Sequence, residues 1–111
     1  KDCDTFVFGS TCENLPNILI ETMAAGLPIA CSNRGPMPEV LGDSGLYFNP
    51  ESVNEIYNAL EMYINNPKIR AEKASASFHD VQKYSWALCT EETFSFLESI
   101  VIDHKKSLCV E

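Results

Sequence analysis

The chain has 111 residues, 45% hydrophobic and 22% charged, which is the composition of one folded domain rather than of a disordered segment. Its formal net charge is -8 and no basic stripe is present, which argues against a nucleic-acid partner. No apolar run approaches the roughly 20 residues of a membrane-spanning helix. Five cysteines without a CxxC pair predict reduced thiols in a cytoplasmic protein, with no metal site.

The first 32 residues predict strand, helix and strand. "TFVF" (Thr5–Phe8) is β-branched and aromatic, which favours a strand. A helix is predicted to begin at Pro16, where a missing N–H costs little, and to stop at Gly26. "LPIACS" (Leu27–Ser32) is a continuous apolar run, typical of a parallel strand that is covered on both faces.

The following 35 residues begin with a loop rich in Gly and Pro, "NRGPMPEVLGDSG", in which we expect one short helical turn. Leu46–Phe48 is the third predicted strand. Ser52 and Glu55 have the spacing of a capping box, which predicts the start of a helix. Asn65, Asn66 and Pro67 end that helix and open another, expected to run to about Tyr84.

The C-terminal stretch "SWALCTEETFSFLESIVIDHK" predicts a last helix with one apolar stripe. We expect Trp86 and the stripe that includes Phe94 to belong to the core. Strands interleaved with helices predict an α/β fold: a short parallel sheet, flanking helices and a helical C-terminal section, in a single domain over residues 1–111. Since three strands make a small sheet, either another chain completes it or the chain is part of a larger protein.

Glu13 and Glu21 stand eight residues apart in "ENLPNILIE". Taken alone, such carboxylates serve as helix caps or solvated groups more often than as ligand contacts. Their surroundings, however, resemble the C-terminal region of family 4 retaining glycosyltransferases, which have the Rossmann-like GT-B fold. The resemblance covers nearly the whole chain and rests on Ser10, Glu13, Glu21, Met23, Ala24, Gly26, Pro28, Gly35, Pro38, Glu39, Val40, Gly45 and Pro50.

The resemblance implies a role for each residue that matches the family's motif. Glu13 would contact hydroxyls of the donor sugar and is the candidate catalytic residue, while Glu21 would hold the ribose of the nucleotide. The backbone N–H groups of Asn14, Leu15, Asn17 and Ile18 would reach toward the sugar and diphosphate. Two further candidates have an alternative: Ser10 touches the ligand or only bonds the turn, and Arg34 approaches phosphate or stays in a solvated loop.

The implied function is retaining transfer of a glycosyl group from a UDP- or GDP-linked donor to an acceptor hydroxyl, with no cofactor. In the family, this chemistry needs an Arg and a Lys upstream of Thr5 and a His in an N-terminal half that binds the acceptor, a glycan or a lipid-linked sugar. We therefore expect the 111-residue chain to be inactive alone. For the full-length enzyme, the family habit implies a cytoplasmic, membrane-peripheral location.

If the family's strand order holds, the neighbour of Thr5–Phe8 in the sheet would precede residue 1. An uncovered edge strand can pair with another copy of the chain, so we expect a homo-oligomer through this edge. Two other functions fit less of the pattern. One is a non-catalytic α/β binding or interaction module on the same scaffold, and the other is a relative of the GT-B sugar-nucleotide 2-epimerases.

Overall fold

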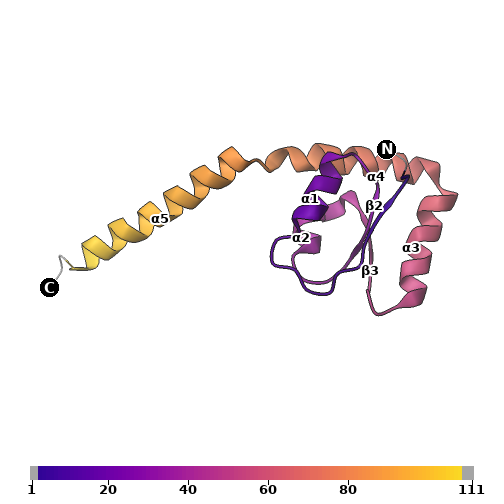
Figure 1. Cartoon of the computed structure of the whole chain (residues 1–111), viewed down its shortest axis with the longest axis horizontal. Helices are drawn as coiled ribbons and strands as arrows, with labels where there is room; N and C mark the ends of the chain where they lie inside the picture. The colour runs from indigo at the N-terminus through magenta and orange to yellow at the C-terminus, as the bar shows by residue number, and fades with distance from the viewer. Residues whose placement is uncertain (1–2, 109–111) are drawn as a thin grey trace.

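Three parallel strands form the centre of the structure. The computed structural model describes residues 3–108, and their side chains from residue 3 to residue 105. The strands are β1 (Phe6–Phe8), β2 (Ile29–Ser32) and β3 (Leu46–Phe48), in the order β1-β2-β3. Ala30 lies opposite both Val7 of β1 and Leu46 of β3. The predicted α/β fold with a short parallel sheet is therefore confirmed (Figure 1).

Strand β2 is buried on both faces, as its continuous apolar sequence predicts. Ile29 and Cys31 point into one core cluster, which helices α1 (Asn17–Ala24) and α2 (Met37–Leu41) complete. Ala30 points into a second cluster under helix α3 (Val53–Asn65). Helices therefore cover both faces of the sheet, and helix α4 (Pro67–Asp80) packs against α1 and α3 (Figure 1).

Helix α1 ends where the sequence predicts, at Gly26. The φ angle of Gly26 is 68°, in the left-handed region that L side chains avoid. Its N–H donates to the carbonyl of Met23 at 3.0 Å, and the N–H of Leu27 donates to the carbonyl of Thr22 at 3.5 Å. These two bonds form a Schellman motif, which satisfies carbonyls at the helix end and turns the chain into β2.

The capping box before α3 is formed in part. The N–H of Glu55 donates to Oγ of Ser52 at 3.3 Å, as predicted. In a complete capping box the carboxylate of Glu55 would accept the N–H of Ser52. Here it accepts the N–H of Asn49 at 2.8 Å instead, and the N–H of Ser52 donates to the carbonyl of Asn49. Glu55 thereby ties the start of α3 to the end of β3.

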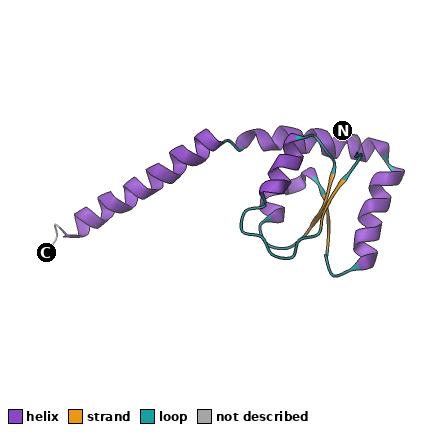
Figure 2. Ribbon diagram, in the orientation of Figure 1, coloured by secondary structure: helices purple, strands orange, loops and turns teal. Residues whose placement is uncertain are grey.

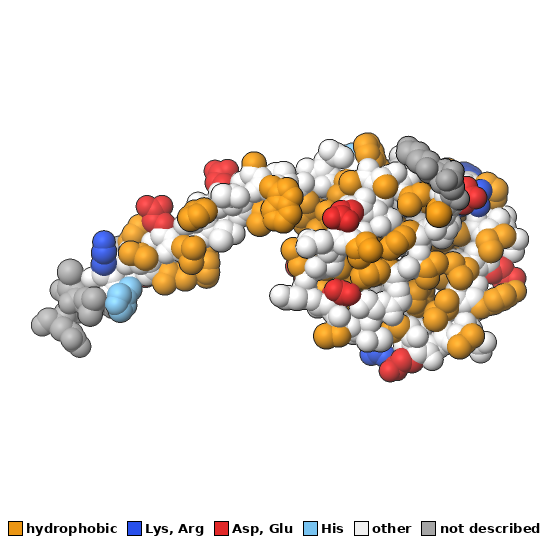
Figure 3. All heavy atoms as spheres, in the orientation of Figure 1, with side chains coloured by type: hydrophobic (Ala, Val, Ile, Leu, Met, Phe, Trp, Pro, Cys, Tyr) orange, Lys and Arg blue, Asp and Glu red, His pale blue; other side chains and the backbone are white. Residues whose placement is uncertain are grey.

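The last helix, α5 (Trp86–Leu108), leaves the rest of the chain and gives the molecule its longest extent of 67 Å, against 28 and 20 Å in the other directions. The prediction that Trp86 and the Phe94 stripe belong to the core is wrong. Trp86 is 81% exposed and Phe94 is 67% exposed, and apolar side chains line the projecting helix (Figure 3). An amphipathic pattern predicts that a helix has an apolar face, but it does not say what covers that face. No helix within residues 3–108 is both long enough and apolar enough to cross a bilayer.

Candidate functional site at the carboxyl edge of the sheet

The carboxyl ends of all three strands meet at one edge, because the strands are parallel. Strand β1 leads into the loop of residues 9–16, β2 leads into residues 33–36, and β3 leads into Asn49. The first two loops run side by side at this edge (Figure 2). Open parallel sheets bind ligands at such an edge, so the predicted site residues of these loops lie in a place suited to a ligand.

Glu13 lies half-buried in the loop between β1 and α1. The hydroxyl of Ser10 donates to the carbonyl of Cys12 at 3.3 Å and so stabilises the turn just before Glu13. On the other side, a Cβ atom placed on Gly35 would lie 3.8 Å from the carbonyl oxygen of Glu13. The loops that carry Glu13 and Gly35 therefore lie near each other, although they are far apart in the sequence.

The N-terminus of α1 follows directly and presents unpaired donors. Pro16 is the N-cap and makes no side-chain capping bond, rather than occupying the first helical position as predicted. Asn17 uses its N–H internally, donating to the carbonyl of Leu15 at 2.9 Å. The N–H groups of Asn14, Leu15 and Ile18 find no acceptor in the described part of the chain, and all three residues are exposed. A helix N-terminus with open N–H groups favours an anion.

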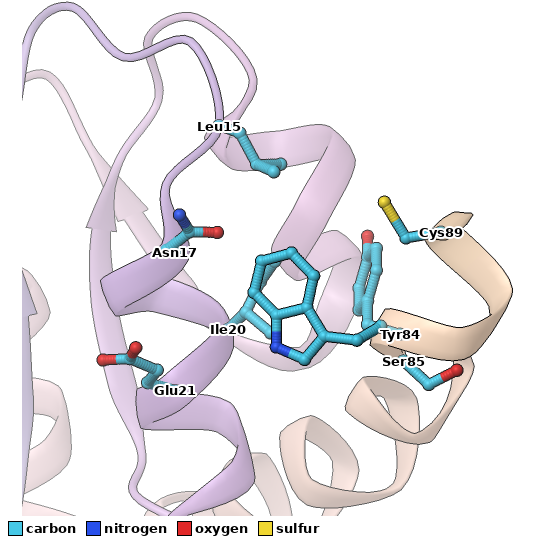
Figure 4. A pocket seen from close by; sticks show the side chains of 8 residues that line it. Leu15, Asn17, Ile20, Glu21, Tyr84, Ser85 and Cys89 are labelled. Atoms are coloured by element: carbon cyan, nitrogen blue, oxygen red, sulfur yellow. The ribbon is translucent and has the colours of Figure 1, made fainter. Parts of the chain in front are cut away.

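Glu21 is exposed on α1, one turn after Asn17. In Figure 4 the carboxylate of Glu21 points away from the ring of Tyr84. Within residues 3–105, the carboxylates of Glu13 and Glu21 make no salt bridge, so both are open to an incoming ligand.

An apolar pocket of about 270 Å³ adjoins this helix and was not predicted from the sequence (Figure 4). It lies between α1 and the junction that leads into α5. The lining residues are Leu15, Asn17, Ile20, Glu21, Tyr84, Ser85, Trp86 and Cys89. The sequence signal for this pocket is "YSW". The hydroxyl of Ser85 accepts the N–H of Leu88 at 3.1 Å and so caps the start of α5. Trp86, the first residue of α5, lines the pocket beside α1.

Arg34 lies at the same edge of the sheet, and its guanidinium is already bonded to two other side chains of the chain. Its Nη2 atom is 3.3 Å from Oδ1 of Asn49 and 3.4 Å from Oε2 of Glu51. The guanidinium therefore joins the loop after β2 to the segment after β3, and no anion is needed to explain its position.

Among the cysteines within residues 3–105, Cys31 alone is buried. Desolvation raises the pKa of the Cys31 thiol to about 12, although a backbone hydrogen bond at Ser32 opposes the shift. Cys12, beside Glu13, is exposed instead. A protonated, buried thiol is a poor nucleophile, so Cys31 serves the core rather than the chemistry of this edge.

The geometry defines a class of protein: an α/β domain with a helix N-terminus and two carboxylates near the carboxyl edge of a parallel sheet. The sequence profile of "Glycosyl transferases group 1" matches residues 1–78, and the chain belongs to this family.

The chain resembles parts of longer proteins. It is 31% identical over 91 residues to O-antigen chain mannosyltransferase B of Escherichia coli, a match that covers 82% of this chain and 24% of the relative. It is 28% identical over 92 residues to the sulfoquinovosyl transferase SQD2 of Arabidopsis thaliana, covering 78% of this chain and 18% of the relative. The chain thus spans a quarter or less of these relatives.

Two solved structures have the same fold. Sucrose-phosphate synthase from Thermosynechococcus elongatus superimposes with a TM-score of 0.79 at 20% identity, over 90% of this chain and 26% of that one. Anabaena Alr3699/HepE, solved in complex with UDP, gives 0.78 at 22% identity, over 87% of this chain and 28% of that one. With the family match, these likenesses confirm the predicted architecture, the C-terminal region of a GT-B glycosyltransferase.

Proposed function

We propose that the chain is the donor-binding region of a retaining glycosyltransferase and that it binds a UDP- or GDP-linked sugar at the carboxyl edge of its sheet. The observation that carries the proposal is the arrangement around the start of α1. Open N–H groups of Asn14, Leu15 and Ile18 lie between Glu13 in the loop and Glu21 on the helix. Membership of the glycosyltransferase family supports it, as does the UDP complex of Alr3699/HepE.

Each part of this arrangement has a chemical task in the proposal. The open N–H groups and the helix dipole favour the negative diphosphate. Glu21 accepts hydrogen bonds from the ribose diol with its two carboxylate oxygens, and Glu13 accepts from hydroxyls of the sugar. Such bonds to a charged group are stronger than bonds between neutral groups, so two carboxylates orient the donor well.

Transfer then breaks the bond between the anomeric carbon and the diphosphate oxygen, and the electron pair goes to the diphosphate. The acceptor oxygen bonds to the anomeric carbon from the same face and gives its proton to the departing diphosphate. Stabilising the charge on the departing diphosphate is the main task of the protein in this step. The helix N-terminus contributes partial charge only, and Arg34 already contacts Glu51. The 111-residue chain is therefore proposed to bind a donor without turning it over.

Titration calorimetry of the 111-residue chain with UDP and with GDP tests the proposal. We expect weak binding of one of them and a loss of tenfold or more in Glu21→Ala, because a hydrogen bond to a charged group contributes about 1.5–3 kcal/mol. Glu92→Ala is the matched control, since Glu92 is also exposed on a helix but lies on α5. If the wild type binds neither nucleotide, the chain is a non-catalytic module on this scaffold and the proposal fails.

An enzymatic assay tests the second part of the proposal. The purified chain is incubated with UDP-glucose or GDP-mannose, and release of the nucleotide is followed over hours. We expect release no faster than in a sample without protein. Turnover that Glu13→Ala removes would show that these 111 residues supply all the charge stabilisation that the reaction needs.

A further inference from the structure

Helix α5 carries an apolar face that lies in water. It runs away from the sheet, and apolar side chains follow it (Figures 1 and 3). Four of them leave half or more of their side chain exposed: Phe94, Leu97, Ile100 and Val101. With 3.6 residues per turn, these four lie within about 120° of the circumference of the helix and form one face, the α5 stripe.

An uncovered stripe of this kind indicates a packing partner. Most of the stability of a helix in a protein comes from packing of its apolar face rather than from its own backbone. Amphipathic helices that lie on membranes carry Lys and Arg beside the apolar face. Helix α5 carries Glu91, Glu92 and Glu98 there, with Lys105 near its end, so its charges suit a protein partner better than an anionic lipid surface.

The α5 stripe has the spacing of a coiled-coil seam. Phe94, Leu97 and Val101 are separated by three and then four residues, the repeat that packs one helix along another. Ala87 and Thr90 continue the same repeat toward the start of α5 with smaller side chains. The stripe therefore fits a second α-helix that runs beside it.

The charges on one flank of the stripe distinguish two orientations of that helix. Glu91, Glu98 and Lys105 are seven residues apart and share this flank. If two α5 helices run antiparallel, equal flanks meet, and Glu91 of each copy faces Lys105 of the other. If they run parallel, the flank meets Thr93 and Ile100, which carry no charge. The charge pattern therefore favours the antiparallel pair.

We propose that α5 is a dimerisation helix, which pairs antiparallel with α5 of a second copy of this chain through the α5 stripe. Two Glu91–Lys105 pairs favour the dimer, and one contact between the two Glu98 carboxylates opposes it. The two sheets then lie at opposite ends of the helix pair, because the sheet of each copy precedes α5. The helix is only about 34 Å long, at a rise of 1.5 Å per residue, so the dimer is weak, with a micromolar Kd.

Sedimentation velocity over a series of micromolar concentrations tests the surface. The series uses the Val7→Lys chain, so that association through the β1 edge does not hide the effect of α5. We expect a monomer–dimer equilibrium that Leu97→Lys abolishes, because the substitution buries an unpaired charge in the seam. Ile102→Lys is the matched control and leaves the dimer intact. Ile102 is as exposed as Leu97, but it lies about 140° away around the same helix.

Two results of this series would overturn the inference. One is a monomer at every concentration, which would leave the α5 stripe to a partner other than a second copy. The other is an equal effect of Leu97→Lys and Ile102→Lys, which would show that the dimer does not use this face.

A charge exchange tests the orientation. Glu91→Lys and Lys105→Glu should each raise the Kd of the dimer about tenfold, because two exposed ion pairs per dimer turn into repulsions. The double variant Glu91→Lys/Lys105→Glu should restore the original Kd. These two side chains are about 21 Å apart along one helix, so they cannot pair within one copy. Glu98→Gln should tighten the dimer, since it removes the like-charge contact. A double variant as weak as the single variants would overturn the antiparallel arrangement.

Discussion

Replacing Gly45 by Ala tests the packing between β2 and α2 directly. Gly45 has an extended backbone, with φ at -134°, so an L residue fits there without backbone strain. The space beside it is full: an added Cβ atom would lie 2.3 Å from Cδ2 of Leu41 and 2.9 Å from the carbonyl oxygen of Ile29. The resemblance predicts a glycine here, and the structure shows that a lack of room is the reason.

The expected cost follows from these two contacts. Overpacking a dense core costs about 1–3 kcal/mol. We expect the upper part of this range for Gly45→Ala, because the Leu41 side chain can rotate only within a buried cluster and Ile29 belongs to the central strand. For a domain of about this size, a loss of 2 kcal/mol lowers Tm by roughly 8 °C or more.

Urea unfolding followed by near-ultraviolet circular dichroism measures the loss, with two glycine variants as controls. Gly9→Ala introduces a Cβ atom with nothing within 4 Å, and its φ is not left-handed, so stability should change by less than about 0.5 kcal/mol. Gly42→Ala meets no atom either, but its φ of 56° and ψ of -136° lie in a region that L residues avoid, which predicts a strain cost of about 1–3 kcal/mol. A Gly45→Ala variant as stable as Gly9→Ala would refute the packing argument.

Three further predictions concern buried groups and the edge of the sheet. Burial raises the pKa of Tyr63 to about 12, whereas the unfolded phenol ionises near 10. The contribution of the neutral Tyr63 phenol to stability is therefore complete below pH about 10 and is lost as the pH rises to about 12. Over this pH range the midpoint of urea unfolding should fall less in Tyr63→Phe than in the wild type. Cys31, which is fully buried, should resist a thiol reagent that modifies exposed Cys12 at once, as seen by mass spectrometry of the folded chain; equal rates would mean that the core opens readily. Val7, 44% exposed on edge strand β1, should support self-association that Val7→Lys reduces in sedimentation velocity. A monomeric wild type would contradict the proposed homo-oligomer.

Local chemistry made most of the fold predictable. Gly26 and Ser52 mark helix ends with side-chain and backbone bonds that involve near neighbours in the chain, and both act as predicted. The run Leu27–Ser32 predicted a strand buried on both faces because it offers apolar side chains to each face. The strand itself is shorter, Ile29–Ser32, since its pairing partners set where it begins.

Trp86 shows where this reasoning fails. Its helix has the apolar spacing of a core helix, and the spacing predicts the helix correctly. Burial of an apolar face, however, requires another element opposite it. Helix α5 leaves the sheet after Ser85, so every residue from 85 to 105 is exposed.

The sequence by itself determined the elements, the α/β class and the two carboxylates, because these depend on residue type and on spacing along one chain. Only the tertiary structure decided which groups meet. Arg34 contacts Glu51 across 17 positions of sequence, and the loop of Gly35 lies near the loop of Glu13. Such contacts arise because parallel strands bring their carboxyl ends to one edge, whatever the distance between them along the chain.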